Sequence, residues 1–354
     1  MIYNFYKGKN VFVTGNTGFK GSWLCRMLLL LGANVTGYAL PPSEENKLFS
    51  LSQVEKDINA IYGDIRDFDS LKKAFDEAKP DIVFHLAAQP LVLEGYKNPA
   101  YTYETNVMGT VNILECARLS GIGSLVNVTT DKVYKNNEWE WGYRENDELG
   151  GYDPYSNSKS CSEMVTACYI RSFFDENSIP VSTARAGNVI GGGDFAENRI
   201  IPDCFRAASC GKPIIVRNPY SVRPYQHVIE PLYAYLEIAR RQYEDKSLAG
   251  NYNVGPNNES YVSTGELVNL FCKYWQASWC SNKTENAPHE AGLLKLDCSR
   301  IKTRLGIEPQ WDIDTAVRKT TLWYLTFFSD PSECMSVMNK QIEEYFDNIK
   351  REAK

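Results

Sequence analysis

The feature that most constrains this chain is a glycine-rich turn close to its amino terminus. Residues 9–14 form a short apolar run that predicts a buried strand, and residues 19–31 have helical character up to Gly32. Between them lies the segment TGNTGFKG, residues 14–21. Glycines at this spacing allow a tight turn, a close approach of the backbone to a pyrophosphate and close packing of helix on strand. The turn predicts a dinucleotide site whose residues are Gly15, Thr17, Gly18, Phe19 and Gly21.

Strands and helices alternate along the following segments. Apolar runs predict strands at residues 34–39, 58–62, 81–86, 124–128 and 179–186, and helices at 67–78, 100–119 and 154–174. Such alternation is typical of a parallel sheet with helices on both faces. We therefore predict an α/β fold, a doubly wound parallel Rossmann sheet with a smaller C-terminal substrate-binding region.

The regular alternation breaks near residue 187, where loops rich in Gly, Pro and Asn begin. We expect residues 1–186 to form an NAD(P)-binding Rossmann domain, to which a later segment near 225–250 returns. Residues 187–330 are expected to form mainly the substrate-binding region, and residues 331–354 a peripheral C-terminal helix.

Composition excludes several classes of protein. The net charge is −6 and the basic residues form no cluster, so we expect no nucleic-acid partner. No apolar stretch is long enough to span a bilayer and the amino terminus does not resemble a signal peptide, which predicts a cytoplasmic protein with no membrane partner. The ten cysteines form no CxxC pair and there are three histidines, so we expect reduced thiols and no metal site.

A Y-x-x-x-K pattern, Tyr155 to Lys159, opens the helix predicted at 154–174. Residues four apart share one helix face, and a neighbouring ammonium lowers the pKa of a phenol, which can then act as a base on a hydroxyl. By spacing alone, an exposed tyrosine and lysine would be the commoner interpretation. The order along the chain favours catalysis, because the glycine turn comes first and Thr129-Thr130 then end the fifth strand.

Together with GDIRD (63–67), HLAAQ (85–89) and NVMGT (106–110), these motifs resemble the extended branch of the short-chain dehydrogenase/reductase superfamily over roughly residues 5–325. Within that branch the chain is similar to the CDP-glucose 4,6-dehydratase group. The segments that carry this resemblance are TDKVY (130–134), GYREND (142–147), GYDPYS (151–156), RPYQHV (223–228) and PHEA (288–291).

The resemblance implies a nucleotide-sugar substrate, NAD as cofactor and a homodimer formed through the helices at about 100–119 and 155–174. It implies further cofactor contacts at Asp64, Ile65, Leu86, Ala87, Ala88, Asn106, Tyr155 and Lys159. The substrate contacts expected from it are Gln89, Asn188, Arg199, Arg223 and His289.

Thr130, Asp131 and Lys132 follow the carboxyl end of a predicted strand, where open α/β sheets bind ligands. Removing water across C5–C6 of a hexose requires an acid for the C6 hydroxyl and a base for the C5 proton. Asp131 suits the acid and a neutral Lys132 the base, and the resemblance implies the same roles, with Thr130 bonding to O4. With Tyr155 and Lys159, these are the predicted catalytic residues.

Two departures from the family pattern stand out. The strand at 34–39 ends without an acidic residue to hold the cofactor's ribose, and no arginine follows it, so the sequence favours NAD over NADP without a strong ribose contact. The second departure is at Leu93 and Glu94, where the family pattern has basic residues. A carboxylate there repels a phosphorylated ligand, which predicts a substrate preference different from that of ordinary CDP-glucose enzymes, or a poorer affinity for CDP-glucose.

Two alternatives remain open from the sequence. A nucleotide-sugar 4-epimerase shares the glycine turn and the Tyr/Lys pair but has no need of an acid/base pair at Asp131 and Lys132. A non-catalytic Rossmann binding module would be expected to lose Tyr155 or Lys159, and both are present.

Overall fold

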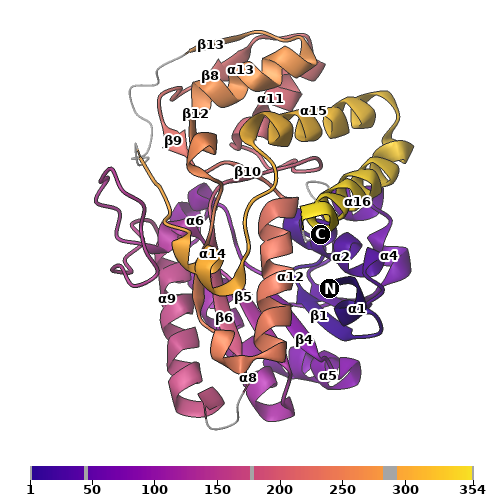
Figure 1. Ribbon diagram of the computed structural model, residues 1–354, viewed down its shortest axis with the longest axis vertical. Helices are drawn as coiled ribbons and strands as arrows, with labels where there is room; N and C mark the ends of the chain where they lie inside the picture. The colour runs from indigo at the N-terminus through magenta and orange to yellow at the C-terminus, as the bar shows by residue number, and fades with distance from the viewer. Residues whose placement is uncertain (1, 44–46, 176–178, 282–292, 353–354) are drawn as a thin grey trace.

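The computed structural model describes residues 2–43, 47–175, 179–281 and 293–352. Its centre is a seven-stranded sheet in the order β11-β6-β5-β4-β1-β2-β3, in which every neighbouring pair is parallel (Figure 1). The strands are β1 (Asn10–Thr14), β2 (Asn34–Ala39), β3 (Asn59–Tyr62), β4 (Ile82–His85), β5 (Ser124–Val128), β6 (Val181–Ala186) and β11 (Asn251–Val254). This sheet confirms the predicted fold class.

Helices cover both faces of the sheet, and each face has its own apolar core. On one face, Trp23 and Leu28 of α2 and Leu232 of α12 pack in the same buried cluster. On the other, Phe75 of α5 and Ile113 of α8 belong to a second cluster. The helices of this half and the one that returns to it are α1 (Ile2–Tyr6), α2 (Phe19–Leu30), α3 (Leu48–Leu51), α4 (Val54–Asp57), α5 (Phe68–Ala78), α6 (Val92–Lys97), α7 (Pro99–Tyr103), α8 (Gly109–Ser120), α9 (Pro154–Tyr169) and α12 (Ile229–Glu244).

The two long helices predicted in this half each contain a π-helical turn. Residues 104–108 form such a turn between α7 and α8, and residues 170–174 form another after α9. Single π turns inside α-helices are often found at functional sites. Here the first of them carries Asn106, one of the predicted cofactor residues.

Beyond residue 187 the chain returns to the sheet through α12 and β11. Three two-stranded sheets pair β7 (Val189–Ile190) with β10 (Gln226–His227), β9 (Val222–Arg223) with β12 (Val262–Ser263), and β8 (Ile214–Val216) with β13 (Trp279–Ser281). The accompanying helices are α11 (Ile200–Ser209), α13 (Thr264–Trp275), α14 (Ser299–Leu305), α15 (Ile313–Ser329) and α16 (Cys334–Glu352). Of these elements, β8, β9, β12, β13, α11 and α13 lie past one end of the seven-stranded sheet (Figure 1).

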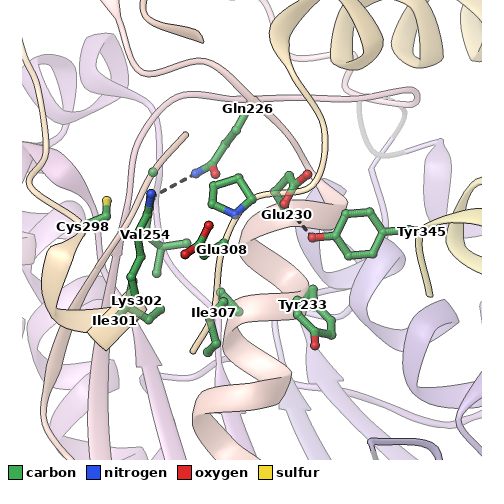
Figure 2. A pocket seen from close by; sticks show the side chains of 13 residues that line it. Gln226, Glu230, Tyr233, Val254, Cys298, Ile301, Lys302, Ile307, Glu308 and Tyr345 are labelled. Carbon is green, nitrogen blue, oxygen red and sulfur yellow. Dashed lines mark hydrogen bonds between the residues drawn. The ribbon is translucent and has the colours of Figure 1, made fainter. Parts of the chain in front are cut away.

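A buried carboxylate, Glu230 at the start of α12, holds the chain after α14 in place. It accepts hydrogen bonds from the backbone N–H of Trp311 (2.7 Å), from that of Gln310 (3.0 Å) and from the Tyr345 hydroxyl of α16 (2.6 Å). Figure 2 shows Glu230 and Tyr345 at one end of a pocket between α12 and α14. None of the predicted site residues lines this pocket.

All ten cysteine thiols are unpaired, in agreement with the expectation from their spacing. Among the helices that the structure describes, none combines the length and the apolar character that crossing a bilayer requires.

Candidate active site

The glycine turn at the carboxyl end of β1 contains two kinds of glycine, some required by the packing of the protein and one that faces the ligand space. Gly15 has φ +76°, and a Cβ there would lie 2.8 Å from the backbone nitrogen of Ala87. A Cβ on Gly21 would lie 2.1 Å from the Gly15 oxygen, so α2 can pack here only without a side chain. A Cβ on Gly18 would meet no described atom closer than 3.4 Å. The middle glycine therefore leaves space in front of the amino terminus of α2, where a pyrophosphate fits.

Two further residues of the turn are held by the chain around it. The Thr17 hydroxyl donates to the Leu40 oxygen (3.1 Å), and Phe19 begins α2. Asn16 is 1% exposed, and its Oδ1 has no hydrogen-bond partner in the described part of the chain. A cradle without side chains and a buried polar atom without a partner together fit a dinucleotide.

The residues predicted on the neighbouring strands lie beside this turn. The Thr14 hydroxyl accepts hydrogen bonds from the backbone N–H groups of Leu86 and Ala87, both at 3.1 Å, so the segment after β4 is tied to the end of β1. Ala88, the next residue, is half-buried. His85 is fully enclosed between Thr14 and Thr110, and burial lowers its pKa to about 3, so it is neutral and structural.

Asp64 and Ile65 follow β3. Asp64 is partly exposed and pairs with Arg66 (2.7 Å), which lowers the pKa of the Asp64 carboxyl. Ile65 is buried against Gly109 of α8, where a Cβ would come within 2.8 Å of it. Asp64 is therefore ionised and can accept hydrogen bonds from a ligand, whereas Ile65 packs in the core.

Asn106 and Gln89 contact each other directly. The Gln89 N–H donates to Asn106 Oδ1 (2.8 Å), and Asn106 Nδ2 donates to the Gln89 oxygen (3.1 Å) and to Ser158 Oγ (2.8 Å). The side-chain amide of Gln89 is also engaged, with Thr102 (2.9 Å) and the Leu91 N–H (2.6 Å). Both ends of the Gln89 amide therefore bond within the protein, each with one further hydrogen-bonding position, and the substrate contact at Gln89 stays a prediction.

Thr130, Asp131 and Lys132 form a turn directly after β5. The Thr130 hydroxyl donates to Asp131 Oδ1 (2.9 Å), while Asp131 Oδ2 is buried without a hydrogen-bond partner among the described residues. Burial raises the pKa of Asp131, and Lys132, Thr130 and Arg223 act in the opposite direction. A buried carboxyl group with a raised pKa and one uncommitted oxygen can donate a proton.

Tyr155 and Lys159 lie on the first two turns of α9, which Asp153 caps by accepting a hydrogen bond from Ser156 N (3.0 Å). Lys159 Nζ donates to the Val128 oxygen at the end of β5 (3.0 Å). A hydrogen bond links the Tyr155 phenol to Thr130. The structure thus brings together the two motifs that the sequence separates.

The electrostatics of this pair differ from the prediction. Burial raises the pKa of Tyr155 to about 12, although the hydrogen bond with Thr130 opposes the rise. Burial also lowers the pKa of Lys159 to about 8, and Glu163 opposes that fall. The prediction that Lys159 brings the Tyr155 pKa down is therefore wrong for this structure, because the loss of solvation of the phenol outweighs its neighbours.

Two of the predicted substrate residues, Arg223 and Arg199, act on the charges of the catalytic groups Asp131 and Tyr155. Arg223, on β9, is 4% exposed and acts on the charge of Asp131. Arg199 precedes α11 and pairs with Asp194 (2.9 Å). Asn188 follows β6, and its backbone oxygen accepts a hydrogen bond from Gln226 N (3.0 Å). His289 lies outside the described residues.

Sequence reasoning missed a third lysine of the site. Lys20 is half-buried on the first turn of α2, and its charge interacts with Arg199, Asp131 and Lys159. Burial lowers its pKa to about 8, and Arg199 adds to this effect. Within the part of the chain that the structure describes, its ammonium has no hydrogen bond or ion pair. The sequence did contain an indication of this role, because Lys20 is a cation within the glycine turn that is predicted to bind phosphate.

The segment that departs from the family pattern, Leu93 and Glu94, lies on α6. Leu93 is 40% exposed, and Glu94 is half-buried with its carboxylate bonded to Asn98 (2.5 Å). The next residue, Gly95, packs so closely on α9 that a Cβ would lie 3.2 Å from the Tyr155 nitrogen. The departure is therefore adjacent to the Tyr155 end of the site.

Comparisons with known proteins agree with this arrangement. The family model described as GDP-mannose 4,6 dehydratase matches residues 12–320. The chain is 45% identical to the CDP-glucose 4,6-dehydratase of Salmonella typhimurium, over 98% of this chain and 99% of the relative.

Solved structures share the fold. The crystal structure of dTDP-glucose 4,6-dehydratase from Streptomyces venezuelae superposes with a TM-score of 0.76 at 23% identity, covering 89% of this chain and 96% of that one. UDP-glucose 4-epimerase from Thermotoga maritima gives a TM-score of 0.78 at 20% identity, covering 89% and 98%.

Proposed function

Because the chain belongs to the GDP-mannose 4,6 dehydratase family, we propose that it is an NAD-dependent nucleotide-sugar 4,6-dehydratase. Its product is the 4-keto-6-deoxy sugar of a nucleoside-diphosphate hexose. CDP-glucose is the first candidate substrate, since a relative with 45% identity over nearly its full length is named for it. The solved dTDP-glucose 4,6-dehydratase with a similar fold carries NAD, which supports the same cofactor here.

The observation that carries the proposal is the contact between the two catalytic motifs. Thr130 bonds on one side to Asp131 and on the other to the Tyr155 phenol. One sugar ring placed here would meet a base for its O4 hydroxyl and an acid for its C6 hydroxyl. A 4-epimerase needs only the first, so the buried Asp131 favours dehydration.

The glycine turn and Asp64 would hold NAD, whose chemistry would be to store the C4 hydride and supply it to C6. Thr130 orients the O4 hydroxyl, and Tyr155 in its phenolate form takes the proton. The positive charges of Lys159 and of bound NAD+ would favour the phenolate against the burial that raises its pKa without ligands. Lys132 removes the C5 proton and Asp131 donates a proton to the C6 hydroxyl, which leaves as water. Lys132 then returns a proton to C5. The O4 proton held by Tyr155 must then reach Asp131, through Thr130 or solvent, so that both groups return to their starting forms.

The cations around the site fit the diphosphate of the substrate. Arg199, Arg223 and Lys20 act on the same buried region, and Arg223 is almost fully buried. A guanidinium matches phosphate oxygens in geometry as well as in charge. The charges that act on Lys20 are those of Arg199 and Lys159, which are positive, and of Asp131 and Asp194, which are negative.

The experiment that tests the function is an assay of the purified protein with NAD+ and a panel of CDP-, UDP-, GDP- and dTDP-hexoses. The expected result is a 4-keto-6-deoxy product, detected by its absorbance in alkali and by its mass. Epimerised sugar without loss of water would support the epimerase alternative, and no turnover of any sugar would contradict the proposal.

We also propose that two copies associate through α8 and α9 and that the enzyme works in the cytoplasm. Large apolar side chains are exposed on these helices and on the π turns next to them, at Met108 (50%), Leu119 (51%), Met164 (62%) and Phe173 (39%). Large apolar side chains exposed on neighbouring helices are typical of a subunit interface. The unpaired thiols support a reducing compartment. Light scattering should give twice the mass of the chain, and Met164→Glu should give the monomer.

A further inference from the structure

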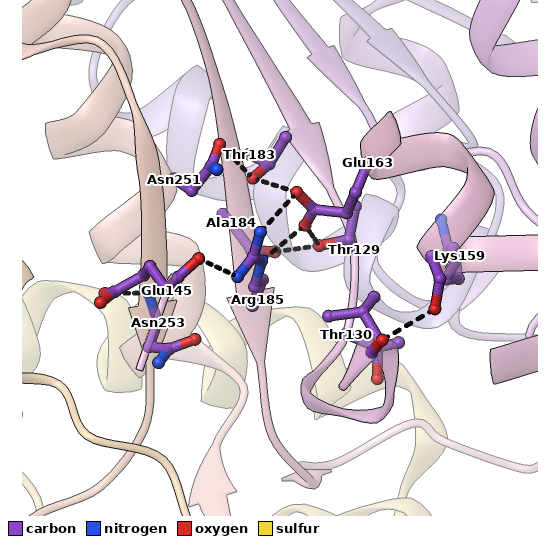
Figure 3. Close-up of polar contacts among 12 residues, drawn as sticks. Thr129, Thr130, Glu145, Lys159, Glu163, Thr183, Ala184, Arg185, Asn251 and Asn253 are labelled. Atoms are coloured by element: carbon purple, nitrogen blue, oxygen red, sulfur yellow. Dashed lines mark hydrogen bonds and ion pairs between the residues drawn. The ribbon is translucent and has the colours of Figure 1, made fainter. Parts of the chain in front are cut away.

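Glu163 and Arg185 form a buried ion pair behind the catalytic residues (Figure 3). Both side chains are 2% exposed, and Nε and Nη2 of Arg185 donate to the two carboxylate oxygens of Glu163, both at 2.9 Å. Thr183 also donates to this carboxylate (2.8 Å). An apolar pair of similar volume often stabilises a fold equally well, so stability alone does not account for two buried charges.

The ion pair holds both ends of the turn that carries Asp131. Thr129, directly before the turn, donates to Glu163 Oε1 (2.5 Å). Tyr134, directly after it, accepts a hydrogen bond from Arg185 Nη1 (2.8 Å). One end of the turn bonds to Glu163 and the other to Arg185. The turn therefore cannot shift without breaking one of these hydrogen bonds or displacing the ion pair.

Glu163 lies on α9, the helix that carries Tyr155 and Lys159, whereas Arg185 lies on β6. Tyr155, Lys159 and Glu163 are spaced four residues apart, which places them along one face of α9. The negative charge of Glu163 raises the pKa of Lys159 against the effect of burial. The other titratable groups that interact with Lys159 are His85 on β4, which is neutral, and Lys20 on α2, which is cationic. Glu163 is therefore the nearest negative influence on Lys159.

We propose that Glu163 and Arg185 are positioning residues that hold the Asp131 turn and the Tyr155/Lys159 face in register, with the Glu163 carboxylate keeping Lys159 charged. This inference rests on the proposed dehydratase function. It assigns to the pair no contact with substrate or cofactor. Both proton-transfer steps, at O4 and at C5, then depend on a pair of residues behind the site.

Glu163→Gln tests the charge of the pair with little change in shape. Both oxidation at C4 and exchange of the C5 proton with solvent should slow by roughly 10²-fold, the effect of a misplacement of about 1 Å. The alkaline limb of the pH profile for C4 oxidation should move to lower pH, because Lys159 loses a negative neighbour and gains the uncompensated charge of Arg185.

Tyr134→Phe tests the turn alone, since it removes one hydroxyl and no charge. C5 exchange should slow by roughly tenfold while C4 oxidation stays within about twofold of the wild-type rate, because the Lys159 side of the pair is untouched.

Glu230→Gln is the matched control, because it makes the same substitution at a carboxylate that is equally buried and bonded but far along the chain from the turn. It should lower the melting temperature and leave both rates and the pH profile unchanged. Melting temperature and NADH fluorescence titration of every variant report folding and cofactor binding separately from turnover.

The proposal is overturned if Glu163→Gln lowers only the melting temperature, with both rates and the pH profile as in the wild type. If Glu163→Gln does not fold, Tyr134→Phe decides. A C5 exchange rate equal to that of the wild type, or an equal slowing of C5 exchange and C4 oxidation, would contradict the inference. If the wild-type protein dehydrates no nucleotide hexose, the proposed function itself is contradicted. The variants test only the role of the ion pair.

Discussion

The chain up to about residue 190 and the chain beyond it differ in how far apart the interacting residues lie in the sequence. In the first part, several site groups follow the end of a strand: the glycine turn follows β1, Asp64 follows β3 and Thr130 follows β5. In the second part, the fold depends on distant contacts such as that of Glu230 with Tyr345. Local sequence therefore predicts where the catalytic and cofactor-binding residues lie, whereas the structure of the substrate-binding region depends on contacts between distant residues.

The largest effect that tests the first part is expected for Gly18→Val. Its side chain has room within the protein but fills the space in front of α2, so NADH binding measured by fluorescence titration should be lost. The melting temperature of the free protein should change little. An unchanged titration would show that the pyrophosphate lies elsewhere.

Gly21→Ala gives the contrast within the same turn. Its methyl group would collide with the Gly15 oxygen, so this variant should lose stability as well as binding. Equal stability of the two variants would contradict the division between ligand-facing and structural glycines.

For the second part, Glu230 predicts a pH-dependent stability. Burial raises its folded-state pKa to about 7, from the ordinary value of 4.5. Its contribution is therefore fully present below about pH 4.5 and is lost as the pH rises through 7. Between pH 5 and 8, the free energy of unfolding of the wild type relative to Glu230→Gln should fall by ~2.5 kcal/mol. Denaturant unfolding at each pH measures this difference in the free energy of unfolding. A difference that stays constant between pH 5 and 8 would contradict the prediction.

The same contrast explains what the sequence could predict. The strands at 34–39 and 124–128 have the predicted bounds, because buried parallel strands leave apolar runs and because Gly32, at φ +78°, marks the end of α2. The segment NYNV that forms β11 has no such run and was missed. The raised Tyr155 pKa and the contact between Glu163 and Arg185 depend on burial, which spacing along the chain does not encode.

A smaller effect is expected for Lys20→Met, which removes the cation that sequence reasoning missed. Loss of one charge-assisted contact with the diphosphate should raise KM for the sugar nucleotide roughly tenfold, equivalent to ~1.4 kcal/mol, with kcat little changed. The wild-type KM should also rise above about pH 8, where the Lys20 ammonium loses its proton. A change in NADH affinity alone would assign Lys20 to the cofactor.

The smallest effect concerns Leu93 and Glu94. Two unit charges separated by about 10 Å interact by only ~0.4 kcal/mol in water, so at such a separation Glu94→Gln would lower KM about twofold. Across CDP-, UDP-, GDP- and dTDP-hexoses, the wild type should show a preference other than CDP-glucose or a poor affinity for it. An efficient preference for CDP-glucose would show that this helix does not face the phosphates.

The central claim is that one site performs oxidation with Tyr155 and elimination with Asp131 and Lys132, and a single-turnover experiment in deuterated water tests it most directly. Lys132→Ala should still oxidise C4 but accumulate NADH and a 4-keto hexose without deuterium at C5, while Tyr155→Phe should form no NADH. The loss in each blocked step should be roughly 10²–10⁴-fold. Wild-type product should carry deuterium at C5. Normal dehydration and C5 exchange by Lys132→Ala would show that the base lies elsewhere and would contradict the account.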